Sequence, residues 1–393
     1  MFRPILISLL LLFPLTALSD GRWSGNVETQ FRYFQHPGLY AEQQQSYASI
    51  AVEPQYTQQW DNGKYSFGFT PFVRYDRHDE ERSHADVREL TWLGVYADWE
   101  LRVGIRKVFW GVTESQHLVD VINQTDFLEN PDGEDKLGQP MINASFVSDL
   151  GIVDVYVLTG FRQRTFAAKD GRPRTPVVVD TSGSTYESSQ EDRHVDYAVR
   201  WHHSVDVWDI GLSQFYGTNR EPTLTPGLNP QGEPVLIPHY ALMSQTGMDV
   251  QATMDNWLLK LEWISRDSTN RRHTALTGGF EYTFVGILES AVDVGVISEY
   301  LFDDRGDAAV FNNHLMVGSR IAFNDAQSTD LLAGVILDLD NKGRMFSLEG
   351  SRRLGDSWKL NLEARVFSGL DVRSLLYPWR DDDFLQLSLG WFF

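Results

Sequence analysis

Apolar and polar residues alternate along short segments throughout the chain. In the last segment, residues 384–393, apolar Leu385, Leu387, Leu389, Trp391 and Phe393 alternate with Gln386, Ser388 and Gly390. A pleated strand with this spacing has one apolar face and one polar face. An exposed apolar edge strand favours aggregation, whereas a strand that closes a barrel leaves no free edge. The pattern therefore favours the closing strand of a membrane barrel, with its apolar face toward lipid.

Segments of the same kind recur from residue 24 onward, separated by turn residues, as in outer-membrane barrels. They are 25–35, 47–60, 64–75, 87–96, 99–109, 141–147, 152–161, 194–202, 207–216, 241–254, 257–265, 273–284, 291–302, 311–323, 330–340, 344–354, 358–367 and 384–393. We expect an all-β fold, a closed antiparallel up-and-down transmembrane β-barrel of about eighteen strands. The count falls to sixteen if two faint segments, such as 47–60, are irregular.

The connections between these segments alternate in length. Every second connection is brief, and the others include three long insertions. Outer-membrane barrels have short periplasmic turns and longer outside loops, so this alternation places the N-terminus in the periplasm. A soluble sandwich or propeller is disfavoured, because the segments show no fixed-period repeat of the propeller kind.

Charged residues occupy one face of several segments. A charge facing lipid at the bilayer midplane costs about 2–4 kcal/mol, so these faces should line the interior. The inward residues are mixed in sign: Arg32, Arg88, Arg102, Arg106, Arg200, Lys260, Arg353 and Arg365, with Glu28, Glu100, Asp196, Glu262, Glu349 and Glu363. No single-sign selectivity filter is evident. Side chains that only neutralise each other and hydrate the wall are the alternative interpretation.

The insertion at residues 110–140 is amphipathic and anionic. A barrel of sixteen to eighteen strands leaves a water channel unless something plugs it. Thr113 or Ser115 is expected to cap a short helix within this outside loop. The loop either folds inward as a constriction or plug, or forms an ordinary outside lid. For the inward case we expect Asp120, Asn123 and Asp126 to line the solute path. The wall residues expected to line the pore are Glu100, Arg102, Arg106, Arg200, Glu363 and Arg365.

The other insertions give weaker indications. Residues 162–192 begin basic and end acidic, which suits an anionic solute, lipopolysaccharide phosphate or simple solvation. Residues 221–238 contain five prolines, which predict a stiffened loop. The acidic clusters at 303–307 and 381–383 lack the spacing of an EF-hand calcium loop. They fit divalent ions that bridge lipopolysaccharide at the rim.

The N-terminus resembles a secretory signal. Arg3 precedes an apolar run, and Ala17-Leu18-Ser19 provides a small-residue cleavage site, so residues 1–19 are predicted to be a signal peptide and residues 20–393 the barrel. No later stretch reaches the ~18–20 apolar residues that a membrane helix needs. The absence of cysteine and the 13% aromatic content agree with an envelope barrel. A net charge of −20 disfavours nucleic-acid binding.

Enzyme motifs are absent from the sequence. It contains no G-x-S-x-G, no H-E-x-x-H, no phosphate-binding glycine loop and no cysteine nucleophile. We therefore expect a non-enzymatic protein without a catalytic site, metal or cofactor. A lipase or protease built from scattered Ser, His and Asp, and a plugged structural or adhesion barrel, are the two alternatives.

A resemblance to known families supports a channel. Residues 24–393 resemble a Gram-negative outer-membrane porin-like barrel, similar in architecture to substrate-specific porins and the alginate exporter. A little-characterised family of large barrels contains an element that resembles a set of residues in this chain: Trp110, Gly111, Asp120, Ile122, Asn123 and Asp126. The resemblance implies passage of a solute or polymer across the outer membrane, amid lipid and lipopolysaccharide. Phe393 resembles the aromatic end by which the barrel-assembly machinery recognises its clients. Substrate, direction and oligomeric state are not implied.

Overall fold

The computed structural model describes residues 21–269 and 271–393, so the predicted signal peptide lies outside the described residues. No helix in these two ranges is long and apolar enough to cross a membrane.

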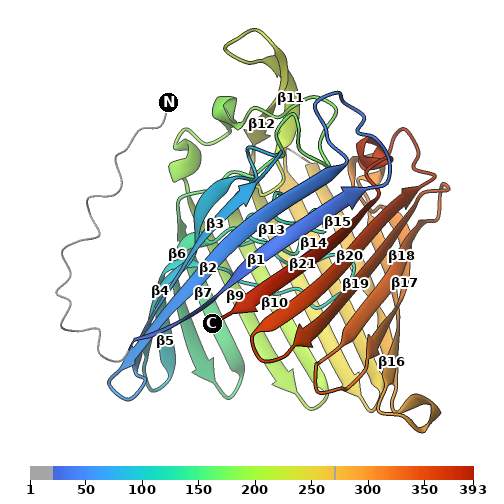
Figure 1. The fold of residues 1–393 in the computed structure, drawn as a ribbon. Helices are drawn as coiled ribbons and strands as arrows, with labels where there is room; N and C mark the ends of the chain where they lie inside the picture. The colour runs from blue at the N-terminus through green and yellow to red at the C-terminus, as the bar shows by residue number, and fades with distance from the viewer. Residues whose placement is uncertain (1–20, 270) are drawn as a thin grey trace.

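Eighteen antiparallel strands form one closed barrel (Figure 1). They are β1 (Arg22–Phe34), β2 (Ser46–Trp60), β3 (Tyr65–Asp76), β4 (His84–Val95), β5 (Trp99–Arg106), β6 (Gln139–Ser148), β7 (Gly151–Thr159), β9 (Val195–Val205), β10 (Trp208–Thr218), β13 (Leu242–Met254), β14 (Trp257–Ser268), β15 (Arg271–Phe284), β16 (Asp293–Asp303), β17 (Asn313–Ala322), β18 (Asp330–Asp338), β19 (Arg344–Leu354), β20 (Trp358–Ser368) and β21 (Phe384–Phe392). The prediction of eighteen strands is confirmed. The alternative of sixteen is excluded, because β2 pairs with β1 from Ser46 to Thr57.

The barrel closes between its first and last strands. Strand β21 pairs antiparallel with β1, with Leu387 opposite Phe31. Beyond the end of β21, the N–H of Gly25 donates to the carbonyl of Phe393 at 3.0 Å, and the N–H of Phe393 donates to Gly25 at 3.1 Å. This ladder leaves no free sheet edge in the barrel wall.

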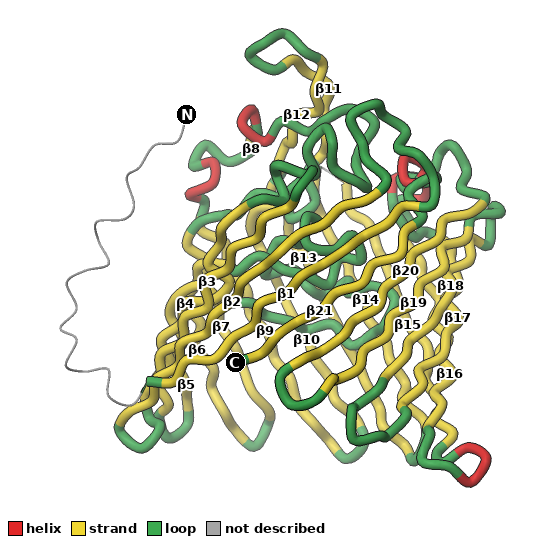
Figure 2. The backbone as a smooth tube through the Cα atoms, in the orientation of Figure 1, coloured by secondary structure: helices red, strands yellow, loops and turns green. Residues whose placement is uncertain are grey.

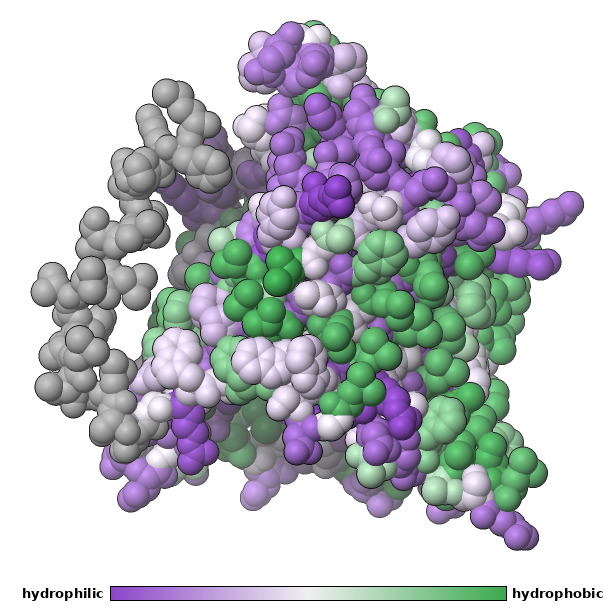
Figure 3. Space-filling view, viewed as in Figure 1, coloured by the Kyte–Doolittle hydropathy of each residue, from purple (hydrophilic) through white to green (hydrophobic). Residues whose placement is uncertain are grey.

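The two faces of the wall differ in polarity. In β21, Leu385, Leu387 and Trp391 are 41–46% exposed on the outside, whereas Gln386 and Ser388 are buried on the inside. Figure 3 shows apolar side chains gathered over the middle of the wall and hydrophilic ones at the end with the long loops. The expected alternation, apolar outside and polar inside, is therefore present.

The connections separate by length at the two ends of the barrel (Figure 2). One end, the short-turn end, carries tight turns such as 61–64, where Asp61, Asn62 and Gly63 have positive φ. The opposite, long-loop end carries 35–45, 107–138, 160–194, 219–241 and 369–383. Aromatic pairs mark the short-turn end: the rings of Tyr96 and Trp99 stack with centroids 4.2 Å apart.

A small second sheet stands at the long-loop end. It contains β8 (Thr185–Tyr186), β11 (Thr223–Leu228) and β12 (Pro234–Tyr240). The proline-rich insertion, expected as a stiff loop, is thus mainly a hairpin. Its prolines fit because Pro234, Pro226 and Pro238 lie at pairs that exchange no ladder hydrogen bonds: Leu236, opposite Pro226, donates its N–H to Val178 instead.

The helix expected after Thr113 or Ser115 does not form; residues 107–138 contain turns and irregular backbone. The short 3₁₀ helices among the described residues lie elsewhere: η2 (Thr181–Gly183), η3 (Glu191–Arg193), η4 (Ile287–Glu289), η5 (Gly306–Ala308) and η6 (Tyr377–Trp379). In a helix capped by either residue, the N–H of Val119 would donate to the carbonyl of Ser115. It donates to Glu262 of the barrel wall instead.

Candidate pore and its inward loop

Residues 107–138, which connect β5 to β6, cross the interior of the barrel; we call them the inward loop. In Figure 2 this segment is part of the green tube that lies inside the barrel, behind the front wall and before the rear wall. Its side chains and backbone bond to inward-facing residues of β3, β4, β14, β16 and β20. The loop is thus fixed to the wall in three regions.

Two wall carboxylates hold the first part of the loop. Glu262 of β14 is fully buried, and its Oε1 accepts the N–H groups of Val112 (2.7 Å) and Thr113 (3.0 Å), while its Oε2 accepts the N–H of Val119 (3.1 Å). Glu299 of β16 accepts the N–H groups of Glu114 (2.8 Å) and Ser115 (2.9 Å). Five backbone N–H groups of the loop are therefore bound by charged acceptors, which form the stronger kind of hydrogen bond.

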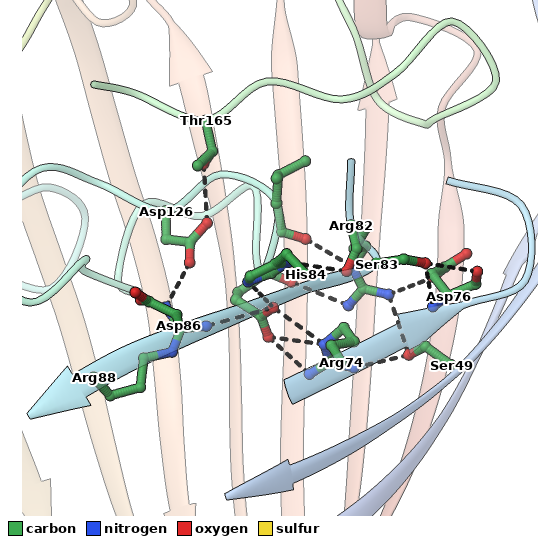
Figure 4. Close-up of polar contacts among 12 residues, drawn as sticks. Ser49, Arg74, Asp76, Arg82, Ser83, His84, Asp86, Arg88, Asp126 and Thr165 are labelled. Atoms are coloured by element: carbon green, nitrogen blue, oxygen red, sulfur yellow. Dashed lines mark hydrogen bonds and ion pairs between the residues drawn. The ribbon is translucent and has the colours of Figure 1, made fainter. Parts of the chain in front are cut away.

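Arginines of β3 and β4 hold the middle of the loop (Figure 4). Arg74 donates to Glu129 through Nη2 at 2.7 Å, and Arg88 donates to Asp126 at 2.7 Å. Arg82, in the connection between β3 and β4, donates to the carbonyl of Leu128 at 2.7 Å. These arginines and carboxylates are at most 9% exposed, so each charge is paired where water is scarce.

The third region faces β20. The amide of Asn130 donates to Glu363 at 3.3 Å, and Arg365 donates to Asp132 at 3.2 Å. Arg365 also donates to Glu349 at 2.6 Å. One guanidinium thus joins the loop to two neighbouring wall strands.

Apolar residues fill the space between the loop and the β6–β15 half of the wall. Trp110, Val119, Val121 and Ile122 pack into one buried cluster with the wall residues Met141, Tyr156, Leu158, Ala198, Phe215, Met243, Ile264 and Ala275. Burial of this apolar surface stabilises the inward position of the loop. At the level of this cluster, this half of the lumen is therefore occupied by packed side chains.

The opposite half contains a cavity of about 780 Å³ between the loop and β17–β21; we call it the passage. At the long-loop end its lining includes Phe311 and Trp379. Toward the short-turn end it includes Asp330, Ser351 and Lys359. Since Asp330 begins β18 and Phe311 precedes β17, the lining reaches close to both ends of the strands.

A second cavity of about 510 Å³ lies on the other side, toward the short-turn end. Trp110 and Val112 of the loop contribute to its lining. Its charges are largely paired: Arg200 binds Asp249 through two hydrogen bonds of 2.7 and 2.8 Å, and Arg102 binds Glu100. Arg106 donates to the neutral amide oxygen of Asn143 at 2.7 Å.

The predicted site residues fall into three groups. Glu363 and Arg365 line the passage, and Glu100, Arg102, Arg106 and Arg200 line the second cavity. Asp120, Asn123 and Asp126 line neither cavity. Asp120 accepts the N–H groups of Trp110 (2.6 Å) and Gly111 (3.0 Å), Asn123 bonds Val108, Arg106 and Leu137, and Asp126 bonds Arg88 and Thr165. Their role in lining a solute path stays a prediction.

Several residues that position the loop were not among the predicted site residues. Glu262 and Arg88 were predicted only to face inward, and Glu299, Glu129, Arg74 and Arg82 were not singled out. Glu299 lies on the inward face of its strand. The sequence indicates this face, because the apolar neighbours Tyr300 and Phe302 point outward. Arg82 lies in a connection without periodicity, so no comparable signal marked it.

Comparisons with known proteins add little to this geometry. No protein-family model and no curated protein matches the sequence. Similar solved structures include one titled "Asymmetric conductivity of engineered proteins" (12% identity, TM-score 0.47) and two mutants of Rhodopseudomonas blastica porin (11% and 12% identity, TM-scores 0.47 and 0.46). Each alignment covers 95% of this chain and 100% of the other. Because the identities do not exceed 12% and the TM-scores lie below 0.5, these similarities carry no argument about function.

Proposed function

We propose that this protein is a channel in the outer membrane of a Gram-negative bacterium. A solute or a single extended polymer would move through the passage between the inward loop and β17–β21. The observation that carries this proposal is the cavity of about 780 Å³, whose lining reaches from the long-loop end toward the short-turn end. We assign no enzymatic activity to the chain.

The outer surface supports placement in a membrane. Apolar side chains point outward along the wall, and the closed sheet leaves no backbone edge in contact with lipid. Aromatic pairs such as Trp257 and Tyr282, whose ring centroids are 4.6 Å apart, lie near the short-turn end, where an interface girdle is expected. Contacts with lipopolysaccharide and recognition of Phe393 by the assembly machinery stay predictions.

The inward loop would act as the constriction. Its apolar side chains close the β6–β15 half of the lumen at the level of the buried cluster, so the open path runs to one side of the barrel axis. Narrowing this off-axis path should reduce ion flow, whereas changes in the second cavity should not.

Conductance in planar bilayers tests the proposal. Ser347 of β19 faces the passage between Gly334 and Arg365, so Ser347→Trp should reduce single-channel conductance by more than half. The control is Ser204→Trp, which places the same side chain beside the second cavity and should leave conductance unchanged. Equal effects of both variants would contradict the assigned path.

A protein that inserts and folds but does not conduct would contradict the channel itself. In that case, labelling of a serine by an activity-based probe would support a lipase or protease. Binding of intact cells to a surface partner by a solute-impermeable barrel would support an adhesion role.

A further inference from the structure

The passage has an apolar wall near its long-loop end. Four inward-facing residues stand opposite one another on adjacent strands: Met316, Ile336, Met345 and Phe367. We call them the apolar row. Their outward neighbours are also apolar; Val317, Phe346 and Val366 are 38–41% exposed. The strands are therefore apolar on both faces at this level, although inward positions of such barrels are ordinarily polar.

This row belongs to a larger apolar group. Phe311 and Leu332, which also line the passage, pack against the cluster formed by Met316, Ile336, Ile297 and Leu301. Phe311, Leu332 and Met345 are only partly buried. Covering their remaining surface with an apolar body would remove it from water, which is favourable.

A charged row lies four residues farther along the strands, about 13 Å away at 3.3 Å per residue. In register, this row contains the charged Arg320, Glu349 and Glu363 together with Leu332 and Gln386. Across the passage, the inward loop contributes Glu114, Asp132 and Glu134. Counting Asp330 and Lys359 as well, six carboxylates and three cationic side chains line the passage.

The cationic side chains are mostly engaged. Arg365 lies within ion-pair distance of Asp132 (3.2 Å), Glu349 (2.6 Å) and Glu363 (3.3 Å). Arg320 is paired with Glu114 at 2.7 Å. An anion in the passage would therefore compete with carboxylates already bound to these guanidinium groups.

The carboxylates retain capacity for a cation. Glu349 is paired with Arg365 and Glu134 with His117 at 3.0 Å, yet their side chains are still 47% and 54% exposed. Glu363 is buried, yet its Oε1 accepts no hydrogen bond from the described residues; its nearest charged contact is Nε of Arg365 at 3.3 Å. This unsatisfied acceptor, together with the acidic excess, points to a ligand that carries N–H donors and positive charge.

We propose that the passage selects amphipathic organic cations, in which an ammonium or guanidinium group is attached to an apolar body. The apolar row contacts the body while the cationic group reaches Glu349 and Glu363. This inference rests on the proposed channel function and adds the class of solute to it.

Ion selectivity and block test the inference. Under a potassium chloride gradient the reversal potential should show preference for potassium over chloride. Benzylammonium should reduce the potassium current with an apparent affinity at least about 10-fold higher than methylammonium, because only the former has an apolar body. Benzoate, with the same ring and the opposite charge, should have no effect.

Two variants separate the contributions. Glu349→Gln should lower the preference for potassium and weaken the block of the current by both amines. Met345→Ser should weaken the block by benzylammonium and leave the block by methylammonium unchanged. The control Asp255→Asn removes one carboxylate from the turn between β13 and β14, where asparagine tolerates the φ of 49°, and should change neither property.

The outcomes distinguish the two proposals. Absence of conductance would overturn the channel. A conducting protein that prefers chloride, or that binds benzylammonium, methylammonium and benzoate equally, would overturn only the assignment of amphipathic cations.

Discussion

Glu262 and Thr113 are separated by 149 residues in the chain, yet Oε1 of Glu262 accepts both the backbone N–H (3.0 Å) and the hydroxyl (2.7 Å) of Thr113. The glutamate belongs to the rigid wall and the threonine to the inward loop. A single buried side chain of β14 therefore ties the first part of the loop to the wall.

Removing this acceptor should loosen the loop. In Glu262→Ala the N–H groups of Val112, Thr113 and Val119 lose their partner, and each buried donor left unpaired costs about 1–3 kcal/mol. The other two anchoring regions and the barrel ladder are unaffected, so the protein should still fold. We expect a higher and noisier single-channel conductance in planar bilayers.

The control for this variant is Glu53→Gln, which alters a half-buried carboxylate of β2 opposite Asn26. It should leave the conductance unchanged. If Glu262→Ala conducts as quietly as the wild type, Glu262 does not determine the position of the loop.

The second anchoring region should show strong coupling between partners. Arg88 and Asp126 are 4% and 0% exposed and 2.7 Å apart. Removing one member of a buried ion pair costs about 3–5 kcal/mol, because the other charge is left unpaired. Arg88→Met should therefore destabilise the protein more than the double variant Arg88→Met with Asp126→Asn. Urea unfolding in detergent micelles measures this difference; additive effects would show that the pair is not coupled.

Much of the barrel was predictable from the sequence. The outward-facing side chains of each wall strand are mostly apolar. Alternating apolar positions such as Leu385 and Leu387 therefore predict both the strand and, between them, the residues that face inward. Short turns with left-handed residues, such as Asp61 and Asn62, separate the strands locally. Strand number, pairing and face depend on patterns within about ten residues, and these patterns are readable.

The conformation of the inward loop was not predictable in the same way. Thr113 and Ser115 carry a local signal for a helix cap, but Glu262, distant in sequence, binds the N–H of Val119 that such a helix would direct to the carbonyl of Ser115. Likewise the charge of Asp120 was evident, but not that Oδ1 would bind the loop's own backbone at Trp110. These contacts arise only when the barrel brings distant segments together.

A glycine in β5 should be essential for strand pairing. Gly104 has a φ of 136°, and a Cβ atom there would lie 1.9 Å from the carbonyl oxygen of Leu90 in β4. Because that oxygen belongs to the backbone, Gly104→Ala forces the two strands apart, and the unfavourable φ alone costs about 1–3 kcal/mol. We expect a lower urea midpoint and a lower yield of heat-modifiable barrel. Gly68→Ala is the matched control, since a Cβ there meets nothing within 4 Å; equal losses in both variants would contradict the role of Gly104.

The seam between β1 and β21 gives the last prediction. Phe393 contributes two hydrogen bonds to Gly25, and the rings of Trp391 and Phe393 lie 5.2 Å apart on the outer surface. Changing both residues to serine keeps the backbone hydrogen bonds but removes apolar surface that should face lipid. We therefore expect impaired assembly into the membrane, although the hydrogen bonds between β1 and β21 can still form. The expected result is a lower yield of heat-modifiable barrel in the outer membrane, measured by gel mobility before and after heating. The control changes Phe346 and Val366 to serine, because these residues are outward-facing and apolar but lie away from the seam. If the two double variants lose the same amount of folded barrel, the loss reflects reduced apolar surface in general, and Trp391 and Phe393 have no special role in closure.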